Sequence, residues 1–169
     1  MSSRQEKVLK EARKRIGSKE WSKDCTRVTM DGKATIGKSS KCNVFVYEML
    51  VAGGVNIPLI QNLKAVPFSA PIVENMIPRV EDWYNRKVPG MQYIGKGIDA
   101  LNKCWPGDII IIYNGIGTPF GHIGNHHIGI ISGPQKTISA SSITNTIVEN
   151  DWGWRKNERD NSEVFRYHP

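Results

Sequence analysis

Cys42 and His127 are the two residues of this 169-residue sequence whose types and positions best suit nucleophilic chemistry. Cys42 begins an apolar segment with helical spacing, and a helix N-terminus lowers a thiol pKa through its partial positive charge and free N–H groups. His127 begins a β-branched run about 85 residues later and could accept the thiol proton. The N–H groups of Cys42 and Asn43 would then stabilise the oxyanion of a tetrahedral intermediate. The alternative is a buried structural cysteine and an unrelated surface histidine.

A second motif, Gly32–Ser39, reads Gly-Lys-Ala-Thr-Ile-Gly-Lys-Ser and satisfies the phosphate-loop pattern. Enzymes with such a loop also hold magnesium through an acid at the end of an apolar strand, whereas Asp108 precedes its strand. The later strands also follow one another directly instead of alternating with helices. A nucleotide-binding protein that uses Lys38 therefore stays as an alternative function.

Three histidines form a His-x3-His-His pattern, at His122, His126 and His127, which could hold zinc with Cys104 as a further ligand. Adjacent strand residues point to opposite faces of a sheet, so we expect that His126 and His127 do not both line one cleft. The sequence therefore predicts no metal site, and it predicts no cofactor.

The composition restricts the class of protein and of partner. Lys and Arg number 23 against 16 Asp and Glu, which gives a formal net charge of +7 and would favour an anionic partner such as a cell wall. No segment combines basic with aromatic residues as a single-strand binder would, so we expect no nucleic acid partner. The 39% hydrophobic and 23% charged shares are typical of a globular chain. We expect a single domain over residues 1–169.

The first 15 residues are charged from Arg4 onward and lack an apolar core, so we expect no secretory signal peptide and synthesis in the cytoplasm. Glu48 interrupts the longest apolar stretch, which stays shorter than the ~18 residues that a membrane span needs. We therefore expect no membrane span.

The spacing of apolar residues predicts an amphipathic helix over Gln5–Ile16 and a second helix over Cys42–Gly53 with one apolar face. The proline-rich residues 58–107 predict surface loops with short helices at Val73–Met76 and Val80–Arg86.

The second half of the chain predicts antiparallel strands. The Gly-rich segment Asn114–Gly124 predicts a loop between the first two of them. Helices followed by such strands predict an α+β fold, in which the Cys42 helix packs on a five- to six-stranded antiparallel sheet. The β-branched runs that predict strands are Asp108–Tyr113, Ile128–Ser132, Lys136–Ala140, Asn145–Val148 and Glu163–Tyr167.

Four short segments within residues 40–145 stand in the order found in one enzyme family. Lys41–Val46, followed by Gly-Gly-Val, resembles the Asp-Cys-Ser-Gly-Phe-Val helix start of NlpC-type cell-wall cysteine peptidases, which belong to the papain-like superfamily. Trp105–Ile109 resembles the Pro-Gly-Asp-Leu motif of that family. His127–Ile131 is similar to its His-Val-Gly-Ile-Tyr strand, and Ile138–Ser142 to its Ile-His-Ala-Ser-Ser strand.

This resemblance implies a role for each matching residue. Cys42 is the nucleophile, and His127 is the general base that later protonates the leaving amine. Ser139 falls on the third position, where the family usually has a histidine or another polar side chain that orients the imidazole. Ser141 lies on the same strand face and could share that role. Serine orients weakly and Asn43 replaces the family's serine, so a Cys-His dyad with auxiliary polar groups stays open.

The resemblance also implies a papain-like hydrolase that cleaves an amide bond in peptidoglycan stem peptides, commonly between D-glutamate and diaminopimelate or lysine. The stand-alone size is similar to that of amidase effectors of type VI secretion. Such an effector would act in the periplasm of a target cell, and an immunity protein would occlude its cleft. An acyltransferase and a catalytically inactive binding module on the same fold stay open beside nucleotide binding.

Four further residues suggest a substrate groove. Trp83, Trp152 and Trp154 could form a platform for a glycan or peptide, although packing over the core is the alternative. Arg155 could hold a substrate carboxylate with its planar fork of donors.

The sequence holds three cysteines, so they do not pair evenly. In an oxidising compartment Cys25 and Cys104 could form a disulfide that leaves Cys42 free. Two unpaired structural cysteines are the alternative.

Overall fold

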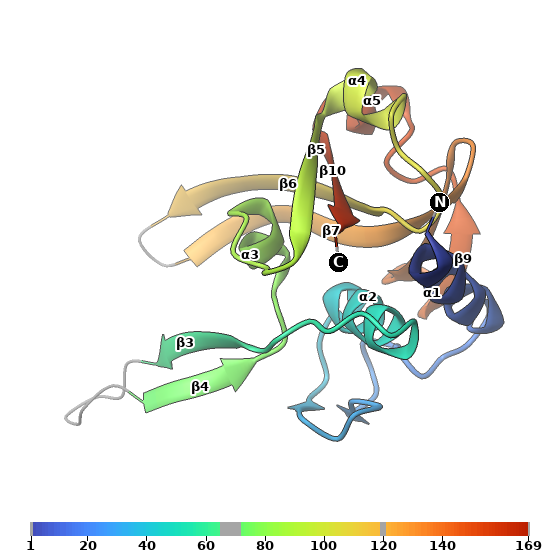
Figure 1. The fold of residues 1–169 in the computed structure, drawn as a ribbon. Coiled ribbons are helices and arrows are strands. Elements are labelled where there is room, and N and C mark those ends of the chain that lie inside the picture. Colours follow the sequence, from blue (N-terminus) through green and yellow to red (C-terminus); the bar gives the residue numbers. More distant parts are fainter. Residues whose placement is uncertain (1, 65–71, 119–120, 169) are drawn as a thin grey trace.

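The computed structural model describes residues 2–64, 72–118 and 121–168 and has an α+β fold (Figure 1). Among these residues a six-stranded antiparallel sheet has the strand order β5-β10-β6-β7-β8-β9, and two hairpins form smaller sheets, β1-β2 and β3-β4. The five helices are α1 Ser3–Lys14, α2 Cys42–Ala52, α3 Val80–Tyr84, α4 Gly97–Leu101 and α5 Lys156–Arg159. The strands of the main sheet are β5 Met91–Lys96, β6 Ile109–Thr118, β7 Gly121–Gly133, β8 Lys136–Ser141, β9 Thr146–Asn150 and β10 Ser162–Tyr167. The hairpin strands are β1 Arg27–Val28, β2 Thr35–Ile36, β3 Ile60–Lys64 and β4 Ile72–Met76.

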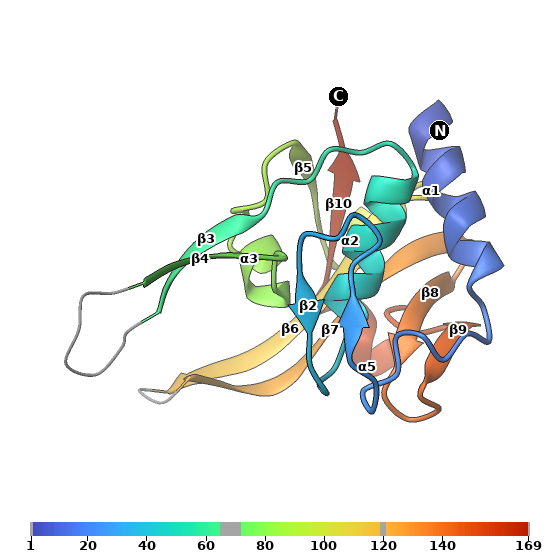
Figure 2. The same ribbon diagram turned by 90° about the horizontal axis from the view of Figure 1, so that it is seen from below.

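Helices α1 and α2 lie side by side on one face of the main sheet, where both contact β7 (Figures 1 and 2). A capping box begins α1, because Ser2 Oγ accepts from Gln5 N and Gln5 Oε1 accepts from Ser2 N. Gly53, at the end of α2, allows the close approach of the two helices, since a Cβ there would lie 2.9 Å from Val8 N. The predicted first two helices are therefore present, with ends that differ by at most two residues.

Helix α2 is buried on all sides, whereas its sequence predicted one apolar face. The residues before it, with the β1-β2 hairpin, cover the side that faces away from the sheet (Figure 2). Glu48, which lies on that covered side, accepts hydrogen bonds from Trp21 Nε1 at 2.5 Å and from Arg27 Nε at 2.8 Å. These bonds hold the preceding segment against α2, so the helix is anchored from both sides.

Asp108, of the Trp-Pro-Gly-Asp motif, connects α1 with the main sheet. Its carboxylate is fully buried and accepts from Gln5 Nε2 at 2.7 Å. Arg166 Nε and Nη2 donate to its two oxygens at 3.0 and 2.7 Å, a bidentate pairing that satisfies the buried charge. The guanidinium of Arg166 also covers the ring of Trp105 at 3.8 Å. The acid of this motif therefore has a structural role.

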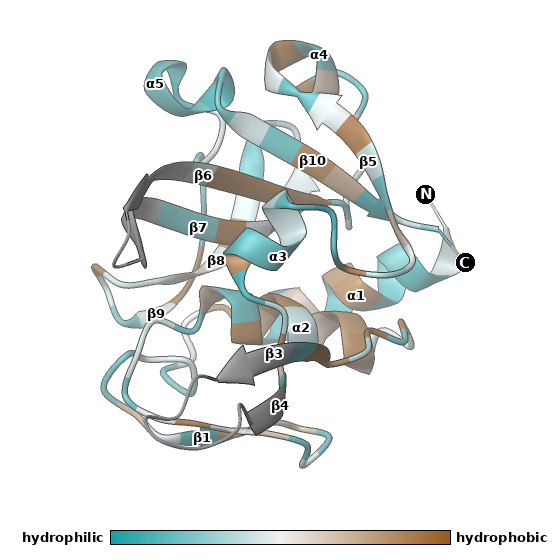
Figure 3. Ribbon diagram, turned by 90° about the vertical axis from the view of Figure 1, so that its left-hand side faces the viewer, coloured by the Kyte–Doolittle hydropathy of each residue, from teal (hydrophilic) through white to brown (hydrophobic). Residues whose placement is uncertain are grey.

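The isoleucine run at the start of β6, which is brown in Figure 3, is buried on both faces of the sheet, as a continuous apolar strand requires. Ile109 and Ile111 face the core beneath α1 and α2. Ile110 faces a second core with Leu101 and Val164, on the side where α4 lies. The described part of the chain contains no helix of the length and apolarity that a membrane crossing requires.

Three segments differ from the sequence prediction. Within Asn114–Gly124, predicted as a loop, the pairing of β6 with β7 continues to Thr118 opposite Gly121, so the two strands form one long hairpin. Val73–Met76, predicted as a helix, belongs to β4, and its pairing with β3 makes a hairpin that projects from the body (Figure 2). Strand β5 was not predicted and completes the six-stranded sheet by pairing with β10.

Candidate active site

Cys42 is the first residue of α2, and the amides around it are not capped by a side chain. Lys41 is the N-cap residue and makes no side-chain cap bond. The first helical bond runs from Phe45 N to Lys41 O at 2.9 Å, so the N–H groups of Cys42 and Asn43 precede the helical ladder. The Asn43 side chain is fixed by donation from its Nδ2 to Pro78 O at 3.2 Å. This helix start thus has two adjacent N–H groups that could bind an oxyanion.

The Cys42 thiol is 4% exposed, and burial raises its pKa. Ser40 Oγ lies 3.8 Å from the sulfur and acts in the opposite direction, as do the backbone N–H groups of Ile128 and Asn43. The contact with Ile128 N places the thiol beside the residue that follows His127. A buried thiol of this kind stays protonated until a neighbouring base removes its proton.

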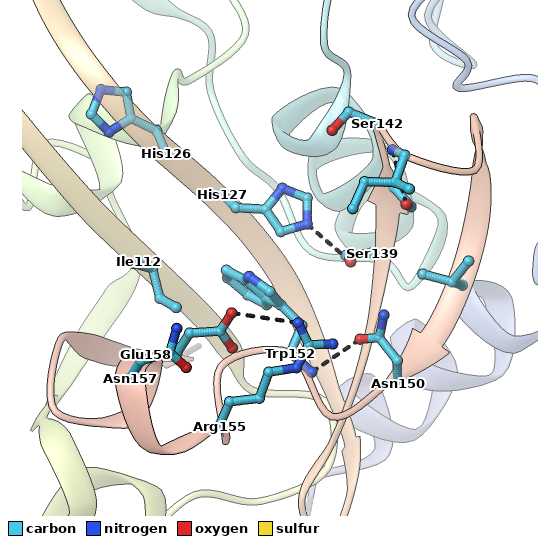
Figure 4. Close-up of a pocket in the computed structure, with 13 residues that line it drawn as sticks. Ile112, His126, His127, Ser139, Ser142, Asn150, Trp152, Arg155, Asn157 and Glu158 are labelled. Atoms are coloured by element: carbon cyan, nitrogen blue, oxygen red, sulfur yellow. Dashed lines mark hydrogen bonds and ion pairs between the residues drawn. The ribbon is translucent and has the colours of Figure 1, made fainter.

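His127, on β7, is held by the neighbouring strand β8. Its Nε2 and Ser139 Oγ lie 3.0 Å apart (Figure 4). The rings of His127 and Trp152 pack edge to face, with centroids 4.4 Å apart. Burial lowers the pKa of His127 to about 4, so the imidazole is neutral at pH 7 and has a lone pair for a proton. In the tautomer that donates from Nε2 to Ser139, that lone pair is on Nδ1.

Gly129 permits the approach of β8 to this part of β7. A Cβ at this position would lie 3.0 Å from Ile138 O and 3.1 Å from Ser139 Cβ. The sequence places Gly129 two residues after His127, on the same face of the strand. A side chain here would therefore separate Ser139 from the imidazole.

Ser141 does not share the role of Ser139. Its Oγ accepts from the backbone N–H groups of Ile143 and Thr144, both at 3.2 Å, in the turn that follows β8. The two serines lie on one strand face, and the structure brings only Ser139 into hydrogen-bond contact with His127.

His126 and His127 line one pocket, contrary to the expectation from strand alternation. Strand β8 pairs with β7 only from Ile130 to Gly133, so β8 does not cover the edge of β7 at the two histidines. His126 stacks on Tyr113 with ring centroids 4.2 Å apart, and its two ring nitrogens are buried without a hydrogen-bond partner in the described structure. Of these two histidines, His127 is therefore the one with a partner that would orient a catalytic imidazole.

This pocket, beside His127 and Ser139, has a volume of about 450 Å³ (Figure 4). Of the four residues predicted to bind substrate, Trp152 and Arg155 line it. Trp83 is 1% exposed and packs in the main core, so the prediction for this residue was wrong. Trp154 does not line the pocket either, and its Nε1 donates to Thr137 Oγ1 at 3.3 Å.

Sequence reasoning assigned no role to four polar residues of this pocket, and only one of them, Ser142, belongs to a motif. They become neighbours only because β9 and α5 follow β8 around the same opening (Figure 4). These residues are Ser142, Asn150, Asn157 and Glu158.

Cys42 itself borders a second cavity, of about 270 Å³, which sequence reasoning did not anticipate. Ser40, Asn43 and Arg79 also line it. The same three residues line a larger cavity of about 580 Å³ between the β1-β2 hairpin and the end of β4. His126 belongs to both the Cys42 cavity and the pocket beside His127. The pocket and the two cavities therefore adjoin one another through shared lining residues, and Cys42 lines the middle one.

The proposed disulfide is not formed in the structure, where all three cysteines are free. Cys25 is exposed, and its Sγ contacts Lys19 O at 3.9 Å. Cys104 Sγ donates to Leu101 O at 2.9 Å, and burial raises the pKa of this thiol to about 11.

The phosphate-loop motif does not form a phosphate-binding loop. Thr35 and Ile36 pair as a strand with β1. Two N–H groups of the motif are already bonded within the hairpin, from Ala34 N to Thr29 Oγ1 at 3.0 Å and from Lys33 N to Asp31 Oδ1 at 3.2 Å. A phosphate cradle needs such N–H groups to point at the ligand.

Within residues 2–64, 72–118 and 121–168, as far as their side chains are described, no three His, Cys, Asp or Glu side chains lie together as a metal site. The side chain of His122, from the zinc alternative, lies outside the described part.

No protein-family model matches the chain, and no curated protein matches it either. The chemistry of the site is therefore indicated by its own geometry.

Proposed function

We propose that the protein is a papain-like cysteine hydrolase that cleaves an amide bond in peptidoglycan stem peptides, with Cys42 as nucleophile and His127 as base. Two observations carry this proposal: the hydrogen bond of 3.0 Å between His127 and Ser139, and the position of the Cys42 thiol at a helix N-terminus. The packing of α2 against β7 and β8 also supports the proposal.

The reaction would proceed in two steps. His127 takes the thiol proton, and the Cys42 sulfur attacks the substrate carbonyl while the N–H groups of Cys42 and Asn43 stabilise the oxyanion. The tetrahedral intermediate collapses to a thioester, and the leaving amine departs with the proton from His127. Water, deprotonated by His127, then attacks the thioester, which releases the carboxylic acid and restores the thiol.

The choice of substrate is supported by charge and by the local sequence resemblance. The formal net charge of +7 would attract the protein to an anionic wall. The pocket and the two cavities together would accommodate an extended peptide across the thiol. The acyl portion would lie on the side of Arg79 and the amine portion on the side of His127. We expect the scissile bond between D-glutamate and the diamino acid that follows it in the stem.

The test is digestion of purified peptidoglycan by the wild-type chain and by Cys42→Ala, with released muropeptides identified by mass spectrometry. Release by the wild type alone would support the proposal and identify the bond. The absence of cleavage by folded wild-type protein, in reducing buffer and with walls of both diamino acids, would contradict it and favour a binding module.

A further inference from the structure

Lys41, the residue that precedes Cys42, carries a buried ammonium group. It is 1% exposed, and its Nζ donates to Ser22 O at 2.9 Å and to Ser39 O at 3.1 Å. Both acceptors are uncharged backbone carbonyls, and burial lowers the pKa of the ammonium. A charge removed from water in this way contributes little to stability. The two bonds therefore indicate that Lys41 has a role in the position of the chain.

The bonds of Lys41 fix the chain on both sides of Ser40. Ser39, which precedes Ser40, is held through its carbonyl by Lys41 Nζ. Lys41, which follows Ser40, is held through its own carbonyl, which accepts from Phe45 N at 2.9 Å in the first helical bond. The bond to Ser22 O connects this segment to the residues that precede the β1-β2 hairpin. The position of Ser40 thus depends on a side chain that does not line the cavity of the thiol.

Ser40 lies beside the sulfur of Cys42. Its Oγ is 3.8 Å from Sγ and can donate a hydrogen bond to it. Ser40 also lines both the Cys42 cavity and the larger cavity that adjoins it. A hydrogen bond donated to an ionised group favours the charged form, so this contact stabilises the thiolate more than the thiol. The hydroxyl keeps its own proton, because the thiol proton goes to His127.

We propose that Lys41 is a positioning residue for the nucleophile, because its ammonium holds Ser39 and thereby keeps the Ser40 hydroxyl where it supports the thiolate of Cys42. This inference rests on the proposed function, in which Cys42 forms the thioester. The cell-wall peptidases that the local sequence resembles have an aspartate at the position of Lys41, so their motif does not supply this arrangement.

The test measures the alkylation of Cys42 by iodoacetamide in the folded protein as a function of pH, with peptide mass spectrometry to follow this thiol alone. Ser40→Ala and Lys41→Met should each lower the rate at pH 7 about 3- to 10-fold. Each should also raise the pH midpoint of the reaction by about 0.5 to 1. Lys38→Met, which removes an exposed lysine of the same segment, is the control and should behave as the wild type.

The double variant Ser40→Ala/Lys41→Met distinguishes positioning from a direct effect of charge. It should react no more slowly than the slower single variant, because both changes remove the same hydrogen bond. A direct effect of the Lys41 charge on the thiol would instead add to the loss of the hydroxyl. Lys41→Gln, which keeps a donor without the charge, replaces Lys41→Met if that variant does not fold, and it should give a smaller loss of rate.

The pH midpoint separates this role from a change in access, which would alter the rate equally at every pH. Three other ionisable side chains line the cavity of Cys42, and Asp24, Cys25 and Arg27 act on the charge of Lys41. All of these side chains are the same in each variant. The three that line the cavity are Arg79, Glu81 and His126.

The outcomes are separate from those of the proposed function, because alkylation needs no substrate. The wild-type rate and midpoint in Ser40→Ala or in the Lys41 variant would overturn the inference, as would additive losses in the double variant. The expected changes in a protein that cleaves no peptidoglycan would support the role of Lys41 and contradict the hydrolase. Cleavage by the wild type together with unchanged midpoints would support the hydrolase and overturn the role of Lys41.

Discussion

The two halves of the candidate site obtain their chemistry in different ways. The thiol half is one residue at one helix N-terminus, and most of its polar groups are backbone amides, those of Cys42, Asn43 and Ile128. The imidazole half is assembled from β7, β8 and the segment after β9, and its polar groups are side chains such as Ser139 and Arg155. Loss of the thiol should therefore abolish chemistry, whereas substitutions in the second half should adjust rate, pH dependence and selectivity.

The largest effect is expected at the thiol. Cys42→Ala should lower the rate of amide cleavage at least about 1,000-fold, because it removes the nucleophile and leaves the fold intact. Initial rates with the diaminopimelate tripeptide, L-alanyl-γ-D-glutamyl-diaminopimelate, measure this loss. Cys104→Ala is the control, since that thiol lines neither cavity and should leave the rate unchanged. A Cys42→Ala variant that retains more than a tenth of the activity would remove the distinction between the halves.

The burial of His127, in the imidazole half, should make the free energy of unfolding depend on pH. The pKa of His127 is about 4 in the folded chain against an ordinary 6.5, so the unfolded chain binds the proton more tightly. Above pH 6.5 the imidazole is neutral in both states, and the free energy of unfolding does not depend on it. As the pH falls toward 4, the unfolded chain binds the proton first, and the free energy of unfolding decreases by about 3 kcal/mol.

His127→Gln lacks that contribution. The fall in its free energy of unfolding between pH 7 and pH 4 should therefore be about 3 kcal/mol smaller than in the wild type. Urea denaturation at the two pH values measures the difference. Equal falls in the two proteins would show that the pKa of His127 is not lowered in the folded state.

A backbone change on β7 should act through packing. Gly129→Ala would place a methyl group against Ile138 O and Ser139 Cβ, which should destabilise the protein by about 1–3 kcal/mol and reduce cleavage. Gly133→Ala is the matched control on the same strand, because a Cβ there meets nothing within 4 Å. Thermal melts and initial rates of both variants test the prediction. Equal stability of the two variants would show that the contact between β7 and β8 does not constrain the site.

The smallest effect is expected from the orienting hydroxyl. Ser139→Ala removes one hydrogen bond to His127 and should lower the rate about 10-fold, which corresponds to the usual net contribution of such a bond. Ser141→Ala is the control, since its hydroxyl accepts from the turn after β8. Equal rates for the two variants would indicate a dyad without a third member.

The elements that local sequence determines were predicted well. The start of α2 at Cys42 follows from apolar spacing, and the strand at Glu163–Tyr167 follows from its β-branched and aromatic residues. Strand β5 was missed because Met91–Lys96 has no apolar alternation, and its extended form depends on pairing with β10. The helix predicted at Val73–Met76 was wrong for the same reason, since pairing with β3 determined its conformation.

In the candidate site too, some features could be predicted from the sequence and others depend on the tertiary structure. The pairing of His127 with Ser139 was anticipated from the local resemblance to the family's motifs, and the structure carries the two residues on the adjacent strands β7 and β8. The burial of Trp83 could not be read from an aromatic residue in a proline-rich segment, because tertiary packing decides which side of a short helix is covered. Glu158 lies in a polar helical turn with no motif, and only the path of the chain after β9 brings it to the pocket.

The most direct test of the central claim is detection of the thioester on Cys42. The wild-type chain is mixed with the diaminopimelate tripeptide, quenched in acid during the first turnover and mapped by peptide mass spectrometry. We expect the peptide containing Cys42 to gain the mass of the alanyl-glutamyl acyl group, while those containing Cys25 and Cys104 do not. Turnover that produces no adduct on Cys42 and continues at the wild-type rate in Cys42→Ala would contradict the proposed role of this thiol.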